Sequence, residues 1–143
     1  MRVSTKGRSG LRVMLELALR FGQGPVLVGV LAEAQEISPS YIHVLMGGLK
    51  TAGLIRAVRG PSGGYELARD PARITVLEVV SALEGDIPAA FGSGKSALVH
   101  GLPSAAEAIW AEAGRAIAES LARHTLKALA ERRTWTFEAP LVR

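Results

Sequence analysis

Apolar residues recur every three or four positions in the first part of the chain, which is the spacing of one face of an α-helix. The first such stripe comprises Leu11, Met14, Leu15, Ala18 and Leu19. Ser4 or Thr5 precedes it as a candidate helix cap, and Gly22 and Pro25 follow it as stop signals. The pattern therefore predicts a first amphipathic helix that buries this stripe.

Two shorter helices follow the first one. The second is expected around residues 28–35, and the third begins after Ser38, an N-cap residue, with Pro39 at its first helical position. The inward face of the third helix is predicted to hold Ile42, Leu45 and Leu49. Two short helices joined by a tight turn are typical of a helix-turn-helix, although any small helical bundle would show the same periodicity.

Residues 54–59 and 65–68 are rich in β-formers, and the turn-rich sequence GPSGG joins them. We expect a β-hairpin here, with Arg59 at its tip. Three helices followed by a hairpin is the order of a winged helix-turn-helix. In that fold the third helix can enter the major groove of DNA, while the hairpin, called the wing, reaches the backbone or the minor groove.

A fourth helix is predicted over residues 76–83. Thr75 and Glu78 have the spacing of a capping box at its start, and Gly85 ends it. The fold class is therefore mainly α with a small β-hairpin wing. The chain divides into a winged helix-turn-helix domain (1–85), a loop that contains Gly and Ser (86–103), a long helix with a short final helix (104–132), and a tail (133–143).

The long helix is expected to begin with a second capping box, formed by Ser104 and Glu107. Its apolar stripe comprises Ile109, Ala113, Ile117 and Leu121. Thr125 is expected to cap the short helix that follows. Periodicity leaves open whether the stripe pairs with a second copy of the chain or folds back onto its own winged domain.

Composition narrows the possible functions. The 143 residues include no cysteine, which excludes disulfides, thiolate metal sites and a cysteine nucleophile. No apolar stretch reaches the roughly 18 residues of a membrane-spanning helix, and the N-terminus lacks a secretory pattern, so we expect a cytoplasmic protein that does not bind membranes.

The net charge of +4 is unevenly distributed. Residues 1–73 hold ten Lys or Arg against five Asp or Glu, and residues 74–143 hold seven against eight. A basic N-terminal half is typical of a module that contacts phosphates, although an unevenly solvated surface would look similar.

The sequence FGSGKS at residues 91–96 is similar to the end of a phosphate-binding P-loop. That motif needs a glycine where this chain has Ala89, and a strand before the loop where the pattern predicts a helix. We therefore interpret the segment as a turn with a solvated lysine.

The sequence shows only weak signals for a metal site or a catalytic site. The three histidines, His43, His100 and His124, are too scattered to indicate a metal site. Glu78 and Glu84 are interpreted as solvated or capping carboxylates, because no nucleophile or oxyanion site accompanies them. We expect neither a bound metal nor an enzymatic activity.

Four motifs follow one another in a fixed order along the chain: STKGRSGLRVMLELAL, ISPSYIHVLMGGLKTAGLI, VRGPSGGYELARDPARITVLEVVSALEG and AIW. Together they resemble the Rrf2 family of winged-helix transcription regulators, and the resemblance covers most of the chain. It implies a homodimeric repressor that binds a partly palindromic operator in double-stranded DNA. It also implies that the long helix is a dimerisation helix that pairs across the two-fold axis, through Ile109, Ala113, Ile117 and Leu121.

The resemblance further implies which residues contact DNA. They are Lys6 and Arg8 at the N-terminus, Ser38, Ser40, Tyr41, His43, Val44 and Lys50 on the recognition helix, and Arg59, Gly60 and Ser62 on the wing tip. The alternative function is a winged-helix module that binds proteins and does not read DNA.

The chain departs from the family pattern in the loop before the long helix. Members that bind an iron–sulfur cluster have three cysteines there, and counting back from Trp110 places Gly92, Leu98 and Ser104 at those positions. None of these side chains is a thiolate, so we expect no cluster and no other cofactor. A small-molecule effector or a protein partner is expected to control DNA binding, as the resemblance to cluster-free members suggests, or the protein acts constitutively.

The recognition helix departs from the pattern as well. His43 and Val44 stand in place of the usual polar pair; Val44 can contact a thymine methyl, and His43 can hydrogen-bond a base edge or a phosphate. Gly47 and Gly48 lie inside the helix, where each glycine costs about 1 kcal/mol relative to alanine. This predicts a helix that is only partly ordered until DNA binds.

Overall fold

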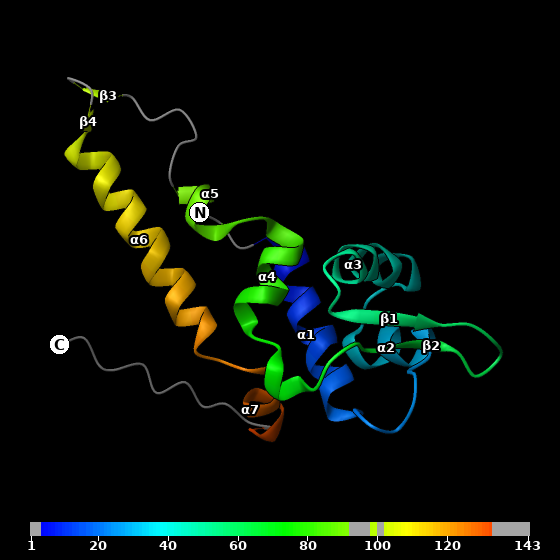
Figure 1. The fold of residues 1–143 in the computed structure, drawn as a ribbon. Coiled ribbons are helices and arrows are strands. Elements are labelled where there is room, and N and C mark those ends of the chain that lie inside the picture. Colours follow the sequence, from blue (N-terminus) through cyan, green and yellow to red (C-terminus); the bar gives the residue numbers. More distant parts are fainter. Residues whose placement is uncertain (1–3, 92–97, 100–101, 133–143) are drawn as a thin grey trace.

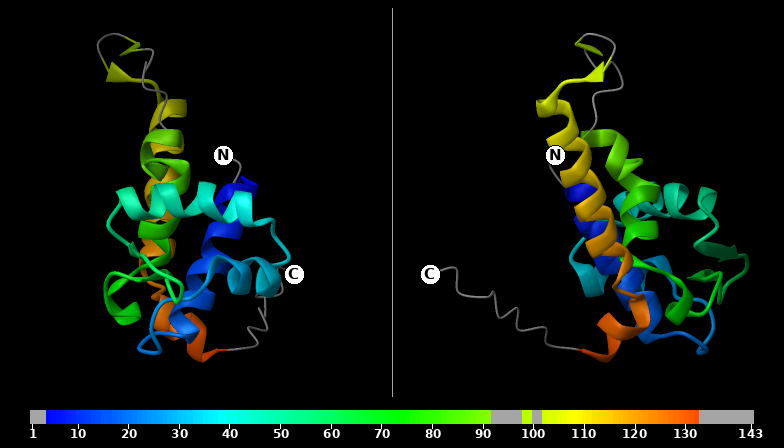
Figure 2. Two further views of the ribbon diagram at one scale, coloured as in Figure 1. Left: turned by 90° about the vertical axis from the view of Figure 1, so that its right-hand side faces the viewer. Right: turned by 60° about the vertical axis from the view of Figure 1, so that its left-hand side comes forward.

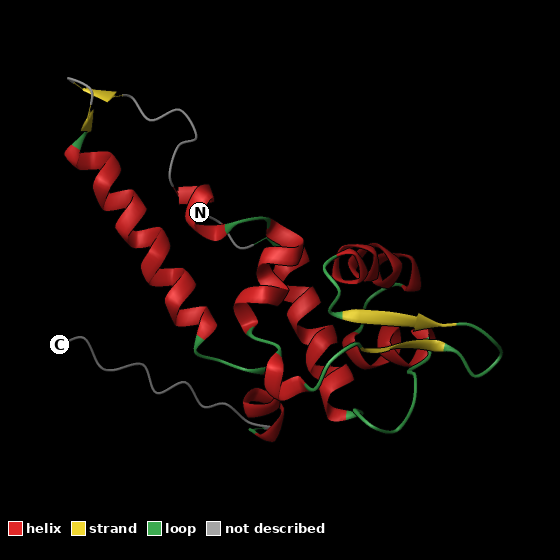
Figure 3. Cartoon of the chain, in the orientation of Figure 1, coloured by secondary structure: helices red, strands yellow, loops and turns green. Residues whose placement is uncertain are grey.

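The computed structural model describes residues 4–91, 98–99 and 102–132. It is mainly helical, with a β-hairpin on one side and a long helix on the other, which confirms the predicted fold class (Figures 1 and 3). No helix in these ranges is long and apolar enough to cross a membrane. The elements, in chain order, are α1 (Thr5–Leu19), α2 (Val28–Gln35), α3 (Pro39–Thr51), β1 (Ile55–Val58), β2 (Gly64–Leu67), the 3₁₀ turn η1 (Pro71–Arg73), α4 (Val76–Glu84), α5 (Ile87–Phe91), β3 (Leu98–Val99), β4 (Leu102–Pro103), α6 (Ala105–Ala122) and α7 (Leu126–Glu131).

Helix α1 lies at the centre of the fold and is buried on more than one face, because α2, α3, α4, α7 and β2 all contact it. Met14 and Ala18 are buried as predicted, but so are Val13 and Leu17, which the predicted stripe did not include. Leu19, which it did include, is 44% exposed. The remaining members of that stripe, Leu11 and Leu15, are half-buried. A single apolar stripe underestimates burial in a helix that has neighbours on several sides.

The helix caps predicted at Ser38, Thr75, Ser104 and Thr125 are confirmed by hydrogen bonds. Side-chain oxygens accept from backbone N–H groups in the first turns of α3, α4, α6 and α7; they belong to Ser38, Thr75, Ser104 and Thr125. The capping box of α4 is complete in both directions. Partial burial opposes ionisation of Glu78, but hydrogen bonds from Thr75 and from the Arg69 guanidinium outweigh it and hold the pKa of Glu78 below its ordinary value.

The hairpin is the predicted wing. Strands β1 and β2 pair antiparallel, with Ile55 opposite Leu67. Val26, which precedes α2, adds a third short pairing on the other edge of β2, where it exchanges two backbone hydrogen bonds with Tyr65 at 2.8 and 2.9 Å. A Cβ atom on Gly64 would lie 2.0 Å from the Val26 carbonyl oxygen, so a glycine is required for this close approach.

The C-terminal end of α4 caps α1. Glu84 Oε1 accepts hydrogen bonds from the backbone N–H groups of Ser4 and Gly7, at 3.0 and 2.9 Å, and from the Ser4 hydroxyl. Ser4 occupies the N-cap position, as one of the two predicted residues, but its hydroxyl donates to Glu84 and makes no cap bond to α1. The carboxylate thus satisfies N–H groups that have no partner within α1, and its charge lies at the positive end of the helix dipole.

Leu83, the residue before Glu84, lies between two helical glycines. A Cβ atom on Gly10 of α1 would lie 2.0 Å from Leu83 Cδ1, and one on Gly48 of α3 would lie 3.1 Å from Leu83 Cδ2. The three helices approach one another this closely because both positions lack a side chain. Helix α3 runs without a break through Gly47 and Gly48, so the structure has a complete helix where partial order was expected.

Part of the region expected to be a loop has regular structure. Residues 87–91 form α5, and the two-residue strands β3 and β4 pair with each other. Helix α6 packs against α5 at Gly114, where a Cβ atom would lie 3.0 Å from the Cβ of Phe91. A helix of five residues has too few turns to produce a readable periodicity, and its stability depends on this packing.

The apolar stripe of α6 is divided between two environments. Ile117 and Leu121 pack within the chain, against a small cluster formed by Val76, Val80 and Ile87. Ala113 is half-buried, and Ile109 is 61% exposed. Half of the stripe therefore folds back onto its own winged domain, which is one of the two arrangements that periodicity left open.

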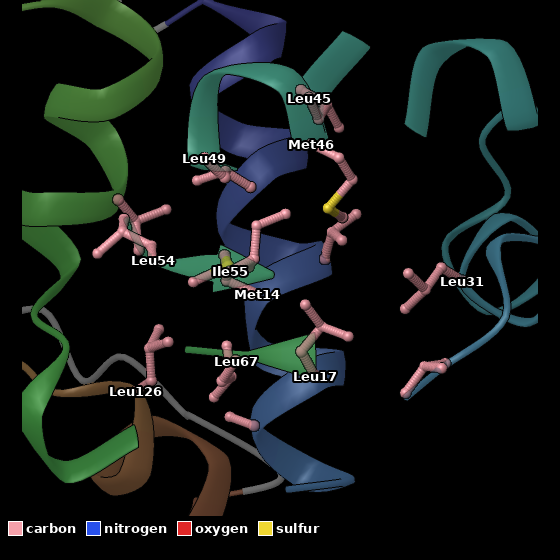
Figure 4. Close-up of a cluster of buried hydrophobic side chains, with 14 of the residues drawn as sticks. Met14, Leu17, Leu31, Leu45, Met46, Leu49, Leu54, Ile55, Leu67 and Leu126 are labelled. Carbon is pink, nitrogen blue, oxygen red and sulfur yellow. The ribbon is translucent and has the colours of Figure 1, made fainter. Parts of the chain in front are cut away.

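After α6 the chain returns to the main core. Leu126 of α7 is fully buried and belongs to the same core cluster as Leu17 of α1 and Leu67 of the hairpin (Figure 4). Its N–H donates to the Ile74 carbonyl at 2.9 Å, and the Val76 N–H donates to the His124 carbonyl at 2.9 Å. Helix α7, which the sequence grouped with the long helix, thus completes the core of the winged part.

The two glycines of α3 should respond differently to the same substitution. Gly47→Ala should stabilise the protein by about 1 kcal/mol, because alanine is the better helix former and the new Cβ would meet nothing within 4 Å apart from neighbouring residues of its own helix. Gly48→Ala should lose that gain, because its Cβ must displace Leu83. Urea unfolding of the two variants without DNA measures the difference. Equal stabilisation at both positions would contradict the close packing of α3 on α4.

Candidate nucleic-acid interface

The outward side of α3 presents most of the predicted contact residues to solvent. The Ser38 cap fixes where the helix begins, and the burial of Ile42, Leu45, Met46 and Leu49 fixes its rotation. Five of the predicted contact residues on the helix and at its cap are exposed: Ser38, Ser40, His43, Val44 and Lys50. Val44 is apolar and yet 55% exposed. Tyr41 differs from the others, because its side chain is half-buried against the main core.

The wing lies beside α3 on the same side of the molecule (Figure 2, left). Its tip exposes Arg59, Gly60 and Ser62. Gly60 has φ +116°, which a residue with a side chain rarely adopts, and its carbonyl accepts from the Gly63 N–H at 3.0 Å. The tip is therefore a tight turn that places Arg59 at its edge.

The two arginines of the wing differ in their partners. Arg56 pairs with Glu66 across the hairpin, with 2.8 Å between Nε and Oε1. Arg59 has no ion-pair or hydrogen-bond partner among the residues that the structure describes. The charge of Arg59 is therefore not neutralised within the described part of the chain.

The two predicted N-terminal contacts lie in the first turn of α1. Lys6 is half-buried and Arg8 is exposed. Glu84 caps this turn, and the neighbouring Leu83 contacts α3 at Gly48. The end of α4 thus holds the N-terminus of α1 and the recognition helix in one rigid arrangement.

A side-chain contact joins the recognition helix to the wing. His43 Nδ1 lies 3.1 Å from the Tyr65 hydroxyl, and the two rings meet edge to face with centroids 6.1 Å apart. Tyr65 was not among the predicted site residues. The sequence marks it only as a β-former in the wing, and periodicity carries no information about a contact between two different elements.

None of the three positions that correspond to the cluster cysteines carries a thiolate. Gly92 and the side chain of Leu98 lie outside the described residues. The FGSGKS segment begins with Phe91, the last residue of α5, and its other residues also lie outside the described ranges. Ser104 caps α6, where its Oγ accepts from the Glu107 N–H at 3.2 Å. The described part of the chain has no group of three or more His, Asp or Glu side chains that could hold a metal ion.

Comparison with known proteins identifies relatives over most of the chain. The family model "Rrf2: Iron-dependent Transcriptional regulator" matches residues 3–132. The HTH-type transcriptional regulator IscR of Xenorhabdus nematophila is 38% identical over 129 residues, which cover 90% of this chain and 79% of the relative. Among solved structures, CymR, the global cysteine regulator of B. subtilis, has a TM-score of 0.78 at 33% identity, covering 94% of this chain and 99% of CymR. IscR of T. potens has a TM-score of 0.73 at 37% identity, and the match covers 92% of this chain and 88% of that structure.

An iron–sulfur cluster held by thiolates needs cysteines, and this chain has none. Without a cysteine no thiolate can hold an iron–sulfur cluster, and the described residues supply no alternative set of three ligands. The residues therefore do not fit the cluster. The fold does fit the family, since the helix order and the wing agree with those of the solved relatives. The chain belongs to the Rrf2 family of winged-helix transcriptional regulators.

Proposed function

We propose that this protein is a cluster-free repressor that binds a partly palindromic operator as a homodimer. The observation that carries the proposal is the solvent-facing side of α3 next to a wing tip whose arginine is unpaired within the described residues. In this proposal the protein occupies its operator and blocks transcription. A small-molecule effector or a protein partner controls its binding to DNA.

The chemistry of the two elements suits the two grooves of DNA. On α3, the hydroxyl of Ser40 and the imidazole of His43 can hydrogen-bond base edges in the major groove, and Val44 can contact a thymine methyl group. Lys50, in the last turn of α3, can pair with a phosphate. Arg59 can enter the adjacent minor groove, whose negative potential attracts a guanidinium.

The exposed part of α6 supports a homodimer. Ile109 and Trp110 are 61% and 53% exposed, although large apolar side chains are usually buried. The small side chains of Ala113 and Ala116 follow along the helix and permit a second helix to approach closely. We propose that Ile109 and Ala113 of the predicted stripe form the dimer contact together with the adjacent Trp110 and Ala116. Ile117 and Leu121, the other two residues of the stripe, anchor α6 to its own domain.

Sequence selection tests the proposed function. Duplexes recovered from a random pool should share a two-fold site, which the protein binds on the order of a thousandfold more tightly than random duplex. Affinity should fall steeply with salt, because phosphate contacts release counterions. Fluorescence anisotropy measures both quantities. If no site emerges and all duplexes bind equally, the protein-binding alternative replaces this proposal.

Arg59→Ala should weaken operator binding by about 1–2 kcal/mol and lower the salt dependence, because one cationic contact is lost. The melting temperature should not change, since Arg59 has no partner within the described residues. Arg73→Ala, which removes another exposed charge, from η1, is the matched control and should bind normally. A loss of stability with intact binding would instead indicate a structural role for Arg59.

Ile109→Glu should dissociate the dimer and abolish operator binding, because it would place a carboxylate on each side of an apolar contact. The same substitution at an exposed alanine on another side of α6, Ala122→Glu, is the control and should remain dimeric. Sedimentation velocity at tens of micromolar distinguishes the two states. A wild-type monomer that still binds the operator tightly would show that the dimer is not required.

A further inference from the structure

Tyr65 has an unusually well-fixed position in the wing. Its backbone lies opposite Ala57 of β1 on one side and pairs with Val26 on the other, through two hydrogen bonds of 2.8 and 2.9 Å. Gly64, next to it, lets the Val26 segment come close. The ring is half-buried and packs against the main core. A side chain that starts from such a rigid point can hold its hydroxyl in a defined place.

That hydroxyl contacts a residue at the centre of the exposed side of α3. The Tyr65 oxygen lies 3.1 Å from His43 Nδ1, and the ring planes make an angle of 67°. The other ring nitrogen of His43, Nε2, has no partner among the described residues. His43 is exposed, so Nε2 is the nitrogen that remains available to DNA.

The chemistry of the two groups determines the direction of this hydrogen bond. A phenol is a stronger donor than a neutral imidazole N–H, and an imidazole nitrogen is a stronger acceptor than a phenol oxygen. The Tyr65 hydroxyl therefore donates to Nδ1 of neutral His43, which leaves the ring hydrogen on Nε2. In the doubly protonated imidazole both nitrogens donate, so Nε2 carries a hydrogen in that state too.

We propose that Tyr65 is a positioning residue for base recognition, and that it holds His43 so that Nε2–H donates to an acceptor on a base edge. The major groove offers such acceptors at N7 and O6 of guanine, N7 of adenine and O4 of thymine, and guanine is the base we expect because its two acceptors lie side by side with no donor between them. The inference rests on the proposed function, since it describes how the same surface would select the base sequence of the operator. It also makes the wing part of major-groove reading, because a strand of the wing orients a side chain of the recognition helix.

The first experiment needs no DNA. Long-range ¹H–¹⁵N spectra of the His43 imidazole report which nitrogen carries the hydrogen. In the wild-type protein at a pH where His43 is neutral, we expect hydrogen on Nε2 and an acceptor-type Nδ1. In Tyr65→Phe, which keeps the ring and removes the hydroxyl, the ring should become a mixture of tautomers. Hydrogen on Nδ1 in the wild type, or identical spectra for both proteins, would overturn the proposal.

The second experiment compares operator preferences from selection with the wild type, Tyr65→Phe, His43→Ala and the double variant. Tyr65→Phe should lower discrimination for guanine at one base pair in each half-site by roughly three- to tenfold, the scale of one hydrogen bond. The double variant should be no worse than His43→Ala, because Tyr65 acts through His43. Glu66→Gln, which breaks the Arg56 ion pair of the same hairpin, is the control and should keep the wild-type base preference.

The outcomes separate this inference from the proposed function. If no operator emerges for any protein, the proposed function fails, and the tautomer measurement still decides whether Tyr65 orients His43. If an operator emerges and Tyr65→Phe has the wild-type base preference, the inference fails and the proposed function stands. Additive losses in the double variant would also overturn the inference, since they would show that Tyr65 acts independently of His43.

Discussion

The fold depends on the contact that the end of α4 makes with α1 and α3. Leu83 lies where side chains on Gly10 and Gly48 would otherwise be, and Glu84 satisfies N–H groups at the start of α1. The apolar contact of Leu83 excludes water, and the carboxylate of Glu84 stabilises the start of α1. Together the two residues fix the distances between α1, α3 and α4 and the rotation of each helix about its axis. The motifs at the two ends of the winged domain, STKGRSG and SALEG, are thus two halves of one packing contact.

This contact positions the surface that we propose faces DNA. With Gly48 against Leu83 and four apolar residues buried, α3 has only one side free, and that side carries Ser40, His43 and Val44. The wing is attached through the pairing of β2 with Val26 and through contacts of β1 with α3 and of β2 with α1. Tyr65 then connects the two elements through His43, so the helix and the wing form a single surface.

The sequence predicted the structural features that depend on residues close along the chain, and it missed those that depend on contacts between distant residues. The caps at Ser38 and Thr75 and the inward face of α3 follow from local chemistry and periodicity, and all were correct. The second buried face of α1 was missed because several helices surround it, and α5 was missed because it depends on packing against Gly114. The link from His43 to Tyr65 joins two elements, for which a single sequence has no signal.

Backbone chemical-shift mapping tests most directly whether the face formed by α3 and the wing is the DNA-binding surface. Amide spectra of the labelled protein would be recorded with and without a selected duplex at low and at moderate salt. The account predicts the largest shifts at residues 38–50 and 57–65, with little change in α7. Shifts concentrated on α6 or α7, with α3 and the wing unchanged, would contradict it.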